Sequence, residues 1–379
     1  MERIHIAAIF GTRPEAIKMA PLIRHLRQRS AFDVTVCVTG QHREMLDQVL
    51  QLFSIQPDVD LDVMSQGQGL AGITARVLEG LEPFFSRKRP NLVLVHGDTA
   101  TTFAASLAAY YCRIPVGHVE AGLRTGNKYA PFPEEMNRCL TGILADLHFA
   151  PTRRAADHLL KEGKPEDSVF ITGNTVIDAM QTTVRENFSH PVLEKIKEKR
   201  IIMVTAHRRE NWGEPMIRMF RAIRRLLDRH ADTAAVFPVH LNPAVQETAR
   251  YCLGDHKRVH LIPPLEVDSF HNFIARSHLI FTDSGGVQEE APSLGVPVLV
   301  MRETTERPEG VEAGTLRLVG TDENRLYEVG DRLLREKREY EQMARAANPY
   351  GDGRASTRIA DAILYYFGRI PHPPVPFKL

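Results

Sequence analysis

Short apolar runs alternate with helix-like segments along this chain, and this alternation constrains its fold more than any other feature. Ile4–Phe10 is a continuous apolar run, which is typical of a strand covered on both faces. Pro14 suits the first turn of a helix. That helix has an apolar stripe formed by Ala16, Met19, Ala20, Leu22, Ile23 and Leu26. Alternating strands and helices predict parallel sheets with right-handed crossovers.

The rhythm occurs in two blocks, and we therefore expect two domains. A polar, charged stretch at Glu186–Arg200 separates them, and the second block starts with the strand Ile201–Thr205. The predicted fold class is α/β, with two doubly wound Rossmann-like domains facing a cleft. Expected boundaries are 1–185 for the first domain and 186–356 for the second, with a helix at 357–379 returning to the first. We expect a hinge near residues 170–200.

Composition excludes several classes of protein. The chain has 379 residues, 43% of them hydrophobic and 25% charged, which are ordinary globular values. Its 48 basic and 47 acidic residues give a net charge of +1, which argues against nucleic acid or a membrane surface as a partner. The sequence shows no signal peptide or long charge-free apolar stretch, and its four cysteines are far apart. We therefore expect a cytoplasmic protein.

A first candidate anion site follows the first strand, at Gly11–Lys18. Gly11 allows a tight turn, and a helix N-terminus favours an anion. Arg13 and Lys18 would add charge-assisted contacts to a phosphate. The alternative is ordinary surface charge at a helix start.

A second candidate lies in Thr282–Glu290, again between a strand and a helix. The amides of Ser284, Gly285 and Gly286 are suited to a diphosphate. Glu290, about one turn into the helix, is placed to accept hydrogen bonds from ribose hydroxyls. The alternative is a tight turn that needs glycine for its conformation.

Three carboxylates form a third group. Asp98 and Glu120 follow successive strands, and Glu134 lies in the segment Pro131–Arg138. The carboxyl ends of parallel strands meet at one edge of a sheet, so these groups should converge. Converging carboxylates suit paired acid and base roles. Alternatively, Asp98 caps the next helix and Glu134 caps its helix or pairs with Arg138.

Imidazoles and guanidiniums end two strands of the second block. His207, Arg208 and Arg209 follow the first of these strands, and His240 follows the next. Because they end neighbouring strands, we expect these side chains to form a polar site; the alternative is that they are exposed to solvent and have no role.

Gly67–Gly72 matches a dinucleotide-binding pattern, but it is a lone match after a weak strand. No Walker, zincin or serine-hydrolase motif occurs.

Taken together, these segments resemble the non-hydrolysing UDP-N-acetylglucosamine 2-epimerases of bacteria. The resemblance covers nearly the whole chain and rests on FGTRPEAIKMAPL, VHGDTATTFAASLAA, GHVEAGLRTG, PFPEEMNR, ITGNTVID, TAHRREN, PVHLNP and TDSGGVQEEAPSLGVPVLVMRETTERPEG. It implies the two-domain GT-B fold and interconversion of UDP-GlcNAc and UDP-ManNAc, which supplies ManNAc for cell-surface polysaccharide. It also implies a homodimer that uses no cofactor and no metal.

The resemblance also implies roles for individual residues. Family catalytic residues fall on Asp98, Glu120, Glu134 and His207. Substrate and UDP contacts fall on Asp98, Glu120 and His207 and on Arg13, Lys18, Arg138, Leu265, Phe270, Ser284, Gly285, Gly286, Glu290 and Arg307. Phe270 would lie near the uracil, and Leu265 would contact the base through its backbone. A second, activating UDP-GlcNAc would bind at Gln41, His42, Glu134, Arg208 and His240, although Glu44 and Gly67 depart from some relatives.

The chemistry explains why a diphosphate site should accompany acidic side chains. The C2 proton of an N-acetylhexosamine is not next to a carbonyl in the ring, so we expect UDP to leave first and 2-acetamidoglucal to form. UDP then adds again while a proton reaches the opposite face. The alternatives are a hydrolysing epimerase, a GT-B glycosyltransferase, and a UDP-sugar sensor without turnover.

Overall fold

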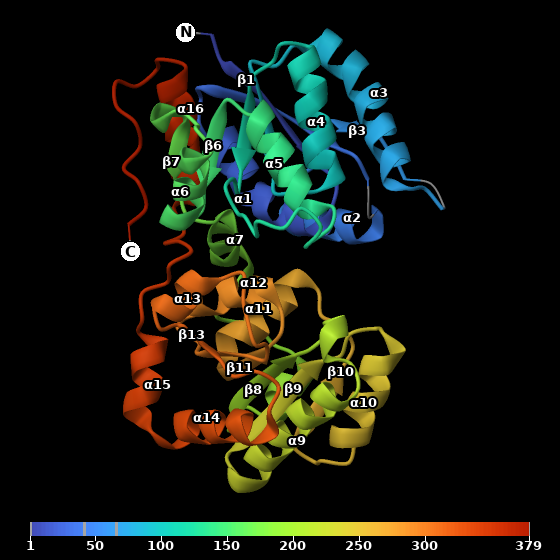
Figure 1. The fold of residues 1–379 in the computed structure, drawn as a ribbon, viewed down its shortest axis with the longest axis vertical. Helices are drawn as coiled ribbons and strands as arrows, with labels where there is room; N and C mark the ends of the chain where they lie inside the picture. Colours follow the sequence, from blue (N-terminus) through green and yellow to red (C-terminus); the bar gives the residue numbers. More distant parts are fainter. Residues whose placement is uncertain (1, 41–42, 65–66, 379) are drawn as a thin grey trace. The chain divides into compact units, whose positions relative to one another are not determined.

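The computed structural model describes residues 2–40, 43–64 and 67–378, without the side chains of residues 43 and 44. The chain divides into two compact units (Figure 1). The first unit comprises Met1–Ala179 and Tyr350–Lys378, and the second comprises Met180–Pro349. The chain thus leaves the first unit six residues before the expected boundary at 185 and re-enters it seven residues before 357.

A seven-stranded parallel sheet forms the centre of the first unit. Its order is β3(Val59–Asp60), β2(Phe32–Val38), β1(Ile4–Phe10), β4(Leu92–His96), β5(Val116–Val119), β6(Leu147–Ala150) and β7(Val169–Ile171). The described helices of this unit are α1(Arg13–Gln28), α2(Arg43–Leu52), α3(Leu70–Lys88), α4(Ala100–Tyr111), α5(Glu134–Leu144), α6(Arg153–Lys161) and α16(Ala355–Tyr366), and α7(Thr175–Thr183) crosses its boundary.

The second unit repeats this plan with a six-stranded parallel sheet. Its order is β10(Val259–Ile262), β9(Thr233–Pro238), β8(Arg200–Thr205), β11(Ser277–Thr282), β12(Val298–Val300) and β13(Leu316–Leu318). Its described helices are α8(Pro191–Lys195), α9(Glu214–Arg229), α10(Pro243–Leu253), α11(Val267–Arg276), α12(Gly285–Glu290), α13(Pro308–Glu312), α14(Glu323–Arg335) and α15(Lys337–Ala344). The predicted α/β class with two doubly wound domains is confirmed.

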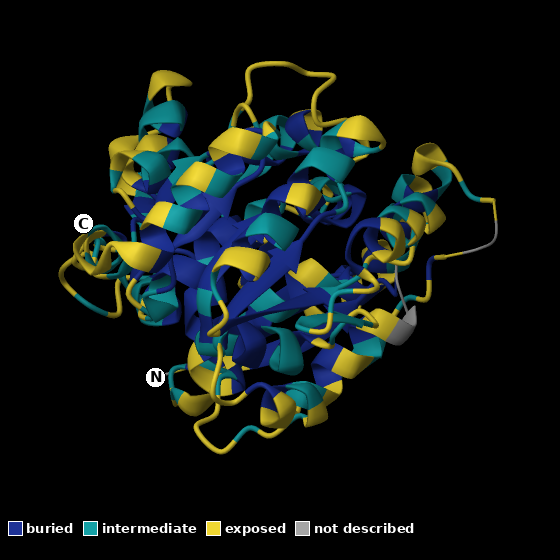
Figure 2. Ribbon diagram, turned by 90° about the horizontal axis from the view of Figure 1, so that it is seen from below, coloured by how far each residue is buried: buried dark blue, intermediate teal, exposed yellow. Residues whose placement is uncertain are grey.

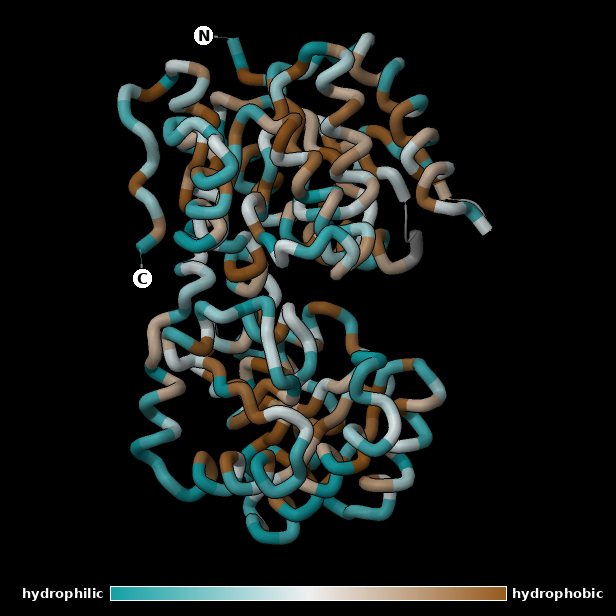
Figure 3. The backbone as a smooth tube through the Cα atoms, in the orientation of Figure 1, coloured by the Kyte–Doolittle hydropathy of each residue, from teal (hydrophilic) through white to brown (hydrophobic). Residues whose placement is uncertain are grey.

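The apolar runs of the sequence form the buried strands of both units. Strand β1 follows the predicted bounds, and its residues Ile6–Phe10 are fully buried. Strands are buried in Figure 2, and Figure 3 shows apolar backbone concentrated inside each unit. None of the helices in the described ranges is both long and apolar enough to cross a bilayer.

Each sheet has a point where its strand order reverses. In the first unit this point lies between β1 and β4, and in the second it lies between β8 and β11. The loops after these strands contain Gly11–Arg13, Gly97–Thr99, Ala206–Arg208 and Asp283–Gly286. Ligands of open α/β sheets bind at such positions, so the fold places the candidate motifs where binding is expected.

Hydrogen bonds explain why the chain returns to the first unit at Tyr350. The Asn174 N–H donates to the Tyr350 carbonyl at 2.7 Å. Asp178 accepts the backbone N–H groups of Ala355 at 3.1 Å and Ser356 at 2.7 Å, which satisfies the start of α16. Asn174 and Asp178, which lie near the point where the chain leaves the first unit, therefore hold residues 350–356 in place. These residues have no regular apolar pattern, so the sequence did not predict the contact.

Candidate functional site

In the first strand-to-helix turn, a carboxyl group of the chain itself binds the backbone amides. Glu15 Oε2 accepts the backbone N–H of Gly11 at 3.0 Å and of Thr12 at 2.7 Å. Thr12 and Glu15 form a capping box at the start of α1. These two amides are therefore occupied by a side chain, whereas the sequence suggested that they would face a phosphate.

Glu15 also joins this turn to the loop after β4. Its Oε1 accepts the hydroxyls of Thr99 at 2.7 Å and Thr102 at 3.1 Å. Burial raises the pKa of Glu15, and hydrogen bonds from Thr99, Thr12 and Gly11 oppose this rise. Glu15 was not among the predicted site residues, but the pattern Thr12-x-x-Glu15 at a helix start is the signal that identifies it.

Asp98 follows β4 and pairs with Arg138 of α5. Arg138 also donates to Glu135 at 2.9 Å. The N-cap of α4 is Thr99, so Asp98 does not have the capping role considered above. Glu134 begins α5 and is half-buried, and its neighbour Glu135 is the residue that pairs with Arg138.

Glu135 is a fixed structural anion. Burial acts to raise its pKa, but the N–H groups of Gly126 and Thr125 and the side chain of Arg138 together hold that pKa below its usual value. Its carboxylate accepts the Thr125 N–H at 2.9 Å and the Gly126 N–H at 3.0 Å. Glu135 therefore orients Arg138, and through it Asp98.

Glu120 follows β5 in a conformation that non-glycine residues rarely adopt, with φ at 62°. Such backbone strain often occurs at functional sites. Its Oε2 pairs with Lys18 of α1 and accepts the Asn174 side-chain N–H at 2.8 Å. Lys18 thus reaches a predicted catalytic acid. Asn174 was not predicted as a site residue.

Three histidines are buried on neighbouring strands beside these acids. Burial lowers the pKa of His96 to about 3, of His118 to about 4 and of His148 to about 3. The His118 Nε2 lies 2.7 Å from the Gly97 carbonyl, and the His96 Nε2 lies 3.8 Å from Glu120 Oε2. These rings are therefore neutral at neutral pH.

In the second unit, Asp283 connects the ends of β8 and β11. It is fully buried, and its carboxylate lies 2.9 Å from the His207 Nδ1. It accepts the backbone N–H of His207 at 3.0 Å and of Arg208 at 2.9 Å. Burial acts to raise the pKa of Asp283, but His207 and these amides hold it below its usual value. Asp283 was not predicted as a site residue.

The turn after β11 has a different character from the turn after β1. No side chain in the described part of the chain caps α12, whose N-cap is Ser284. Gly285 and Gly286 do not have positive φ values, so their conformation does not require glycine. A Cβ on Gly285 would have Arg307 Nη2 as its nearest neighbour, 4.0 Å away, and one on Gly286 would lie 3.3 Å from Glu290 Oε1. The structure thus brings Arg307 and Glu290 to the glycines.

The remaining predicted contacts are spread over several elements of the two units. Arg208 Nε donates to the Asp283 carbonyl at 3.1 Å, and Arg208 pairs with Glu306 at 3.3 Å. The His207 and His240 rings stack with centroids 5.9 Å apart. Leu265 and Phe270 pack partly against the core of this unit.

The other predicted residues belong to the first part of the chain. Gln41 and His42 lie outside the described residues. Arg13 begins α1, and Gly67 has a positive φ of 75°.

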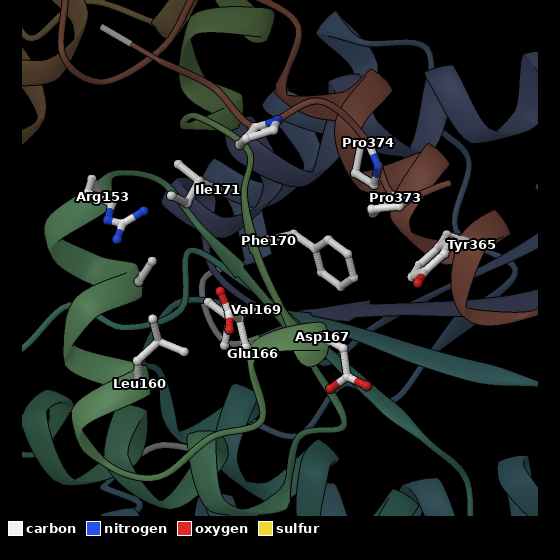
Figure 4. Close-up of a pocket in the computed structure, with 12 residues that line it drawn as sticks. Arg153, Leu160, Glu166, Asp167, Val169, Phe170, Ile171, Tyr365, Pro373 and Pro374 are labelled. Atoms are coloured by element: carbon white, nitrogen blue, oxygen red, sulfur yellow. The ribbon is translucent and has the colours of Figure 1, made fainter. Parts of the chain in front are cut away.

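A separate cavity of about 520 Å³ lies at the β7 edge of the first sheet (Figure 4). Phe170 of β7, Tyr365 of α16 and Pro373 line it. None of the site residues above contributes to its walls. The described ranges contain no group of three or more His, Cys, Asp or Glu side chains arranged to hold a metal ion.

Two doubly wound units, each with polar groups at the point where its strand order reverses, define a two-domain α/β protein of the GT-B type, a fold that binds ligands at such points. The family model for UDP-N-acetylglucosamine 2-epimerase matches residues 24–364. This chain therefore belongs to the UDP-N-acetylglucosamine 2-epimerase family, whose members are isomerases.

Individual relatives support this assignment over the full length. The chain is 61% identical to UDP-N-acetylglucosamine 2-epimerase of Bacillus subtilis, with 97% of each chain covered. A solved structure of S. aureus MnaA with UDP is 55% identical, has a TM-score of 0.89 and covers 99% of this chain and 100% of that one. The Neisseria meningitidis enzyme bound to UDP-GlcNAc is 47% identical, has a TM-score of 0.85 and covers 95% and 100%.

Proposed function

We propose that this protein interconverts UDP-GlcNAc and UDP-ManNAc at C2 without releasing free sugar. The observation that carries this proposal is the division of chemistry between the two units. The first unit places strand-end carboxylates beside Arg138 and Lys18, and the second has an uncapped Ser-Gly-Gly turn next to Arg307 and Glu290. Its family membership and the UDP and UDP-GlcNAc bound to relatives support the same substrate.

The reaction begins with loss of UDP. The C1–O bond breaks and its electron pair moves to the β-phosphate oxygen, while the C2 proton passes to a carboxylate and a C1–C2 double bond forms. The products are UDP and 2-acetamidoglucal. In the return step UDP attacks C1 and a proton reaches C2 from the opposite face. Stabilising and retaining the departing diphosphate is therefore essential.

In our assignment the first unit handles the sugar. Two of Asp98, Glu120 and Glu134 remove and return the C2 proton, and the third orients the ring. Arg138 and Lys18, which pair with Asp98 and Glu120, orient these two carboxylates.

The nucleotide is bound mainly by the second unit in this assignment. The Gly285 and Gly286 amides, His207, Arg307 and Arg13 contact the diphosphate, and Glu290 accepts hydrogen bonds from ribose hydroxyls. The Ser284 N–H already donates to Thr282 Oγ1 at 2.9 Å, so Ser284 acts as the N-cap residue of α12 in this assignment. Phe270 and the Leu265 backbone contact the uracil. The Leu265 side chain packs partly against the core, which fits a contact through its backbone.

Proton NMR of UDP-GlcNAc incubated with the protein in D₂O tests the reaction directly. We expect UDP-ManNAc to appear with deuterium at C2, because the proton removed by a carboxylate exchanges with solvent. Product that retains the C2 proton would contradict elimination. Free ManNAc instead of UDP-ManNAc would favour the hydrolysing alternative, and no conversion without an acceptor would favour a glycosyltransferase or a sensor.

Three further expectations belong to this proposal. A homodimer is supported by the exposed apolar side chains Tyr110 and Tyr111 of α4 and Ile143 of α5, which are 61%, 68% and 69% exposed. A second, activating UDP-GlcNAc would contact Arg208, His240 and Glu134, along with Gln41 and His42. We also expect the protein in the cytoplasm.

A further inference from the structure

We propose that Asp283 is a positioning residue for His207: it binds the Nδ1 side of the imidazole, so that Nε2 is the ring nitrogen presented to the nucleotide sugar. This inference rests on the proposed function, in which His207 contacts UDP. It adds a residue that contacts His207 from the end of the neighbouring strand β11.

The carboxylate is placed to hold the ring in one orientation. Its Oδ1 lies 2.9 Å from the His207 Nδ1. Both oxygens also lie close to the His207 backbone N–H, at 3.2 and 3.0 Å. The same residue therefore fixes the backbone and the side chain of His207, which limits how the ring can rotate.

The environment of Asp283 favours its ionised form. It is fully buried, yet Oδ2 accepts the Arg208 N–H at 2.9 Å and the Asn211 Nδ2–H at 3.1 Å. An ionised carboxylate only accepts hydrogen bonds. The neutral imidazole must then carry its proton on Nδ1, which leaves the Nε2 lone pair for the ligand or, when protonated, a second N–H donor.

The ring is restrained from a second side. His240, which follows β9, stacks on His207 with an interplanar angle of 24°. The His207 side chain nevertheless remains 41% exposed. An imidazole that is fixed at Nδ1 and stacked on a neighbour, but still accessible, is suited to contact a ligand through Nε2.

A purely structural role is the competing explanation, because Asp283 also holds the 206–211 loop in place. Two variants separate the explanations. Asp283→Asn replaces the acceptor of the Nδ1 proton, whereas Asn211→Ala removes one donor to the same carboxylate and leaves the Nδ1 contact intact. We expect kcat to fall about 10²-fold in Asp283→Asn, on the scale of general acid–base catalysis, with KM for UDP-GlcNAc within about threefold. Asn211→Ala should keep kcat within about threefold.

The double variant His207→Ala/Asp283→Asn tests whether Asp283 acts through the ring. If it does, the double variant is as slow as His207→Ala alone. The proposal would be overturned if the kcat losses of the two single variants multiplied in the double variant. It would also be overturned if Asn211→Ala lost as much kcat as Asp283→Asn.

The ¹⁵N NMR spectrum of the wild-type His207 ring shows which ring nitrogen carries the proton. This test does not depend on whether any variant folds. We expect the neutral ring to carry its proton on Nδ1. A ring protonated on Nε2 instead would refute the positioning role. This reading also stands if the wild-type protein does not epimerise UDP-GlcNAc, a result that would remove the proposed function alone.

Discussion

The turns after β1 and β11 each lie beside the point where the strand order of their sheet reverses, but they use a buried carboxyl group in opposite ways. Glu15 turns back onto its own helix start and accepts the Gly11 and Thr12 amides. Asp283 turns away from α12 and accepts amides of the loop after β8. The first helix start is consequently filled by the chain, whereas α12 has no side-chain cap in the described structure.

The glycines of the two turns differ for the same reason. A Cβ on Gly11 would lie 1.9 Å from Thr39 Oγ1 and 2.8 Å from Thr101 Oγ1, so the packing of the chain itself excludes a larger residue. The nearest atom to the Cβ position of Gly285 is Arg307 Nη2 at 4.0 Å, an ordinary van der Waals distance. Packing within the chain therefore requires glycine at position 11, whereas the described neighbours of Gly285 would tolerate a Cβ.

If the first unit carries the proton chemistry, its acids should control turnover and not nucleotide binding. We expect Asp98→Asn and Glu120→Gln each to lower kcat by about 10²–10⁴-fold, because each removes a group that transfers or orients the proton. UDP affinity, measured by calorimetry, should change little. Asp157→Asn on α6, an exposed partner of Arg153, is the matched control. Near-normal turnover in both acid variants would rule out these roles.

A substitution in the turn after β11 should weaken UDP binding but leave the stability of the fold unchanged. Gly285→Ala places a methyl group where we expect phosphate, and UDP affinity should fall at least tenfold. The melting temperature should stay within about 1 °C, since the nearest atom to the new methyl is 4.0 Å away. Unchanged UDP affinity would show that phosphate does not approach this turn.

A substitution in the turn after β1 should lower the stability of the fold more than it affects UDP binding. Gly11→Ala forces a contact with Thr39 and Thr101, which are hydrogen-bonded to each other at 2.9 Å. We expect the free energy of unfolding to fall by about 1–3 kcal/mol, as in other overpacked cores. Chemical denaturation measures this loss. A stable Gly11→Ala variant that has lost UDP binding would mean that both turns are ligand sites.

Lowering the pH should destabilise the first unit more than the second, because the first has more buried histidines with a lowered pKa. His96, His118 and His148 of the first unit have pKa values lowered by burial to about 3, 4 and 3, from 6.5 in the unfolded chain. Their neutral forms stabilise the fold above pH 6.5, and this stability is lost as the pH falls from 6.5 towards 4, by up to about 1.4 kcal/mol per pH unit for each ring.

The second unit also contains His278, whose pKa burial lowers to about 4. With three such rings against this one, amide hydrogen exchange should show the first unit losing protection before the second between pH 7 and pH 5. Earlier loss in the second unit would contradict this expectation.

Much of the architecture was predictable because it depends on local patterns. Continuous apolar runs located β1, β8 and β11, and the loops after them contained several of the candidate residues. The short strand β7, by contrast, has little periodic signal of its own. The boundary at Tyr350 depends on hydrogen bonds from Asn174, which lies far away along the chain. Such pairings are not encoded in any one segment.

The sequence by itself determined the two parallel sheets, the position of the strand-end loops and the family, because apolar periodicity and motif spacing are properties of neighbouring residues. Only the tertiary structure decided which partners the buried acids have. Glu15 meets Thr99 across 84 residues and Asp283 meets His207 across 76, so their partners exist only once the strands are side by side. Burial then fixes their hydrogen bonds, since an unpaired carboxylate inside a protein is costly.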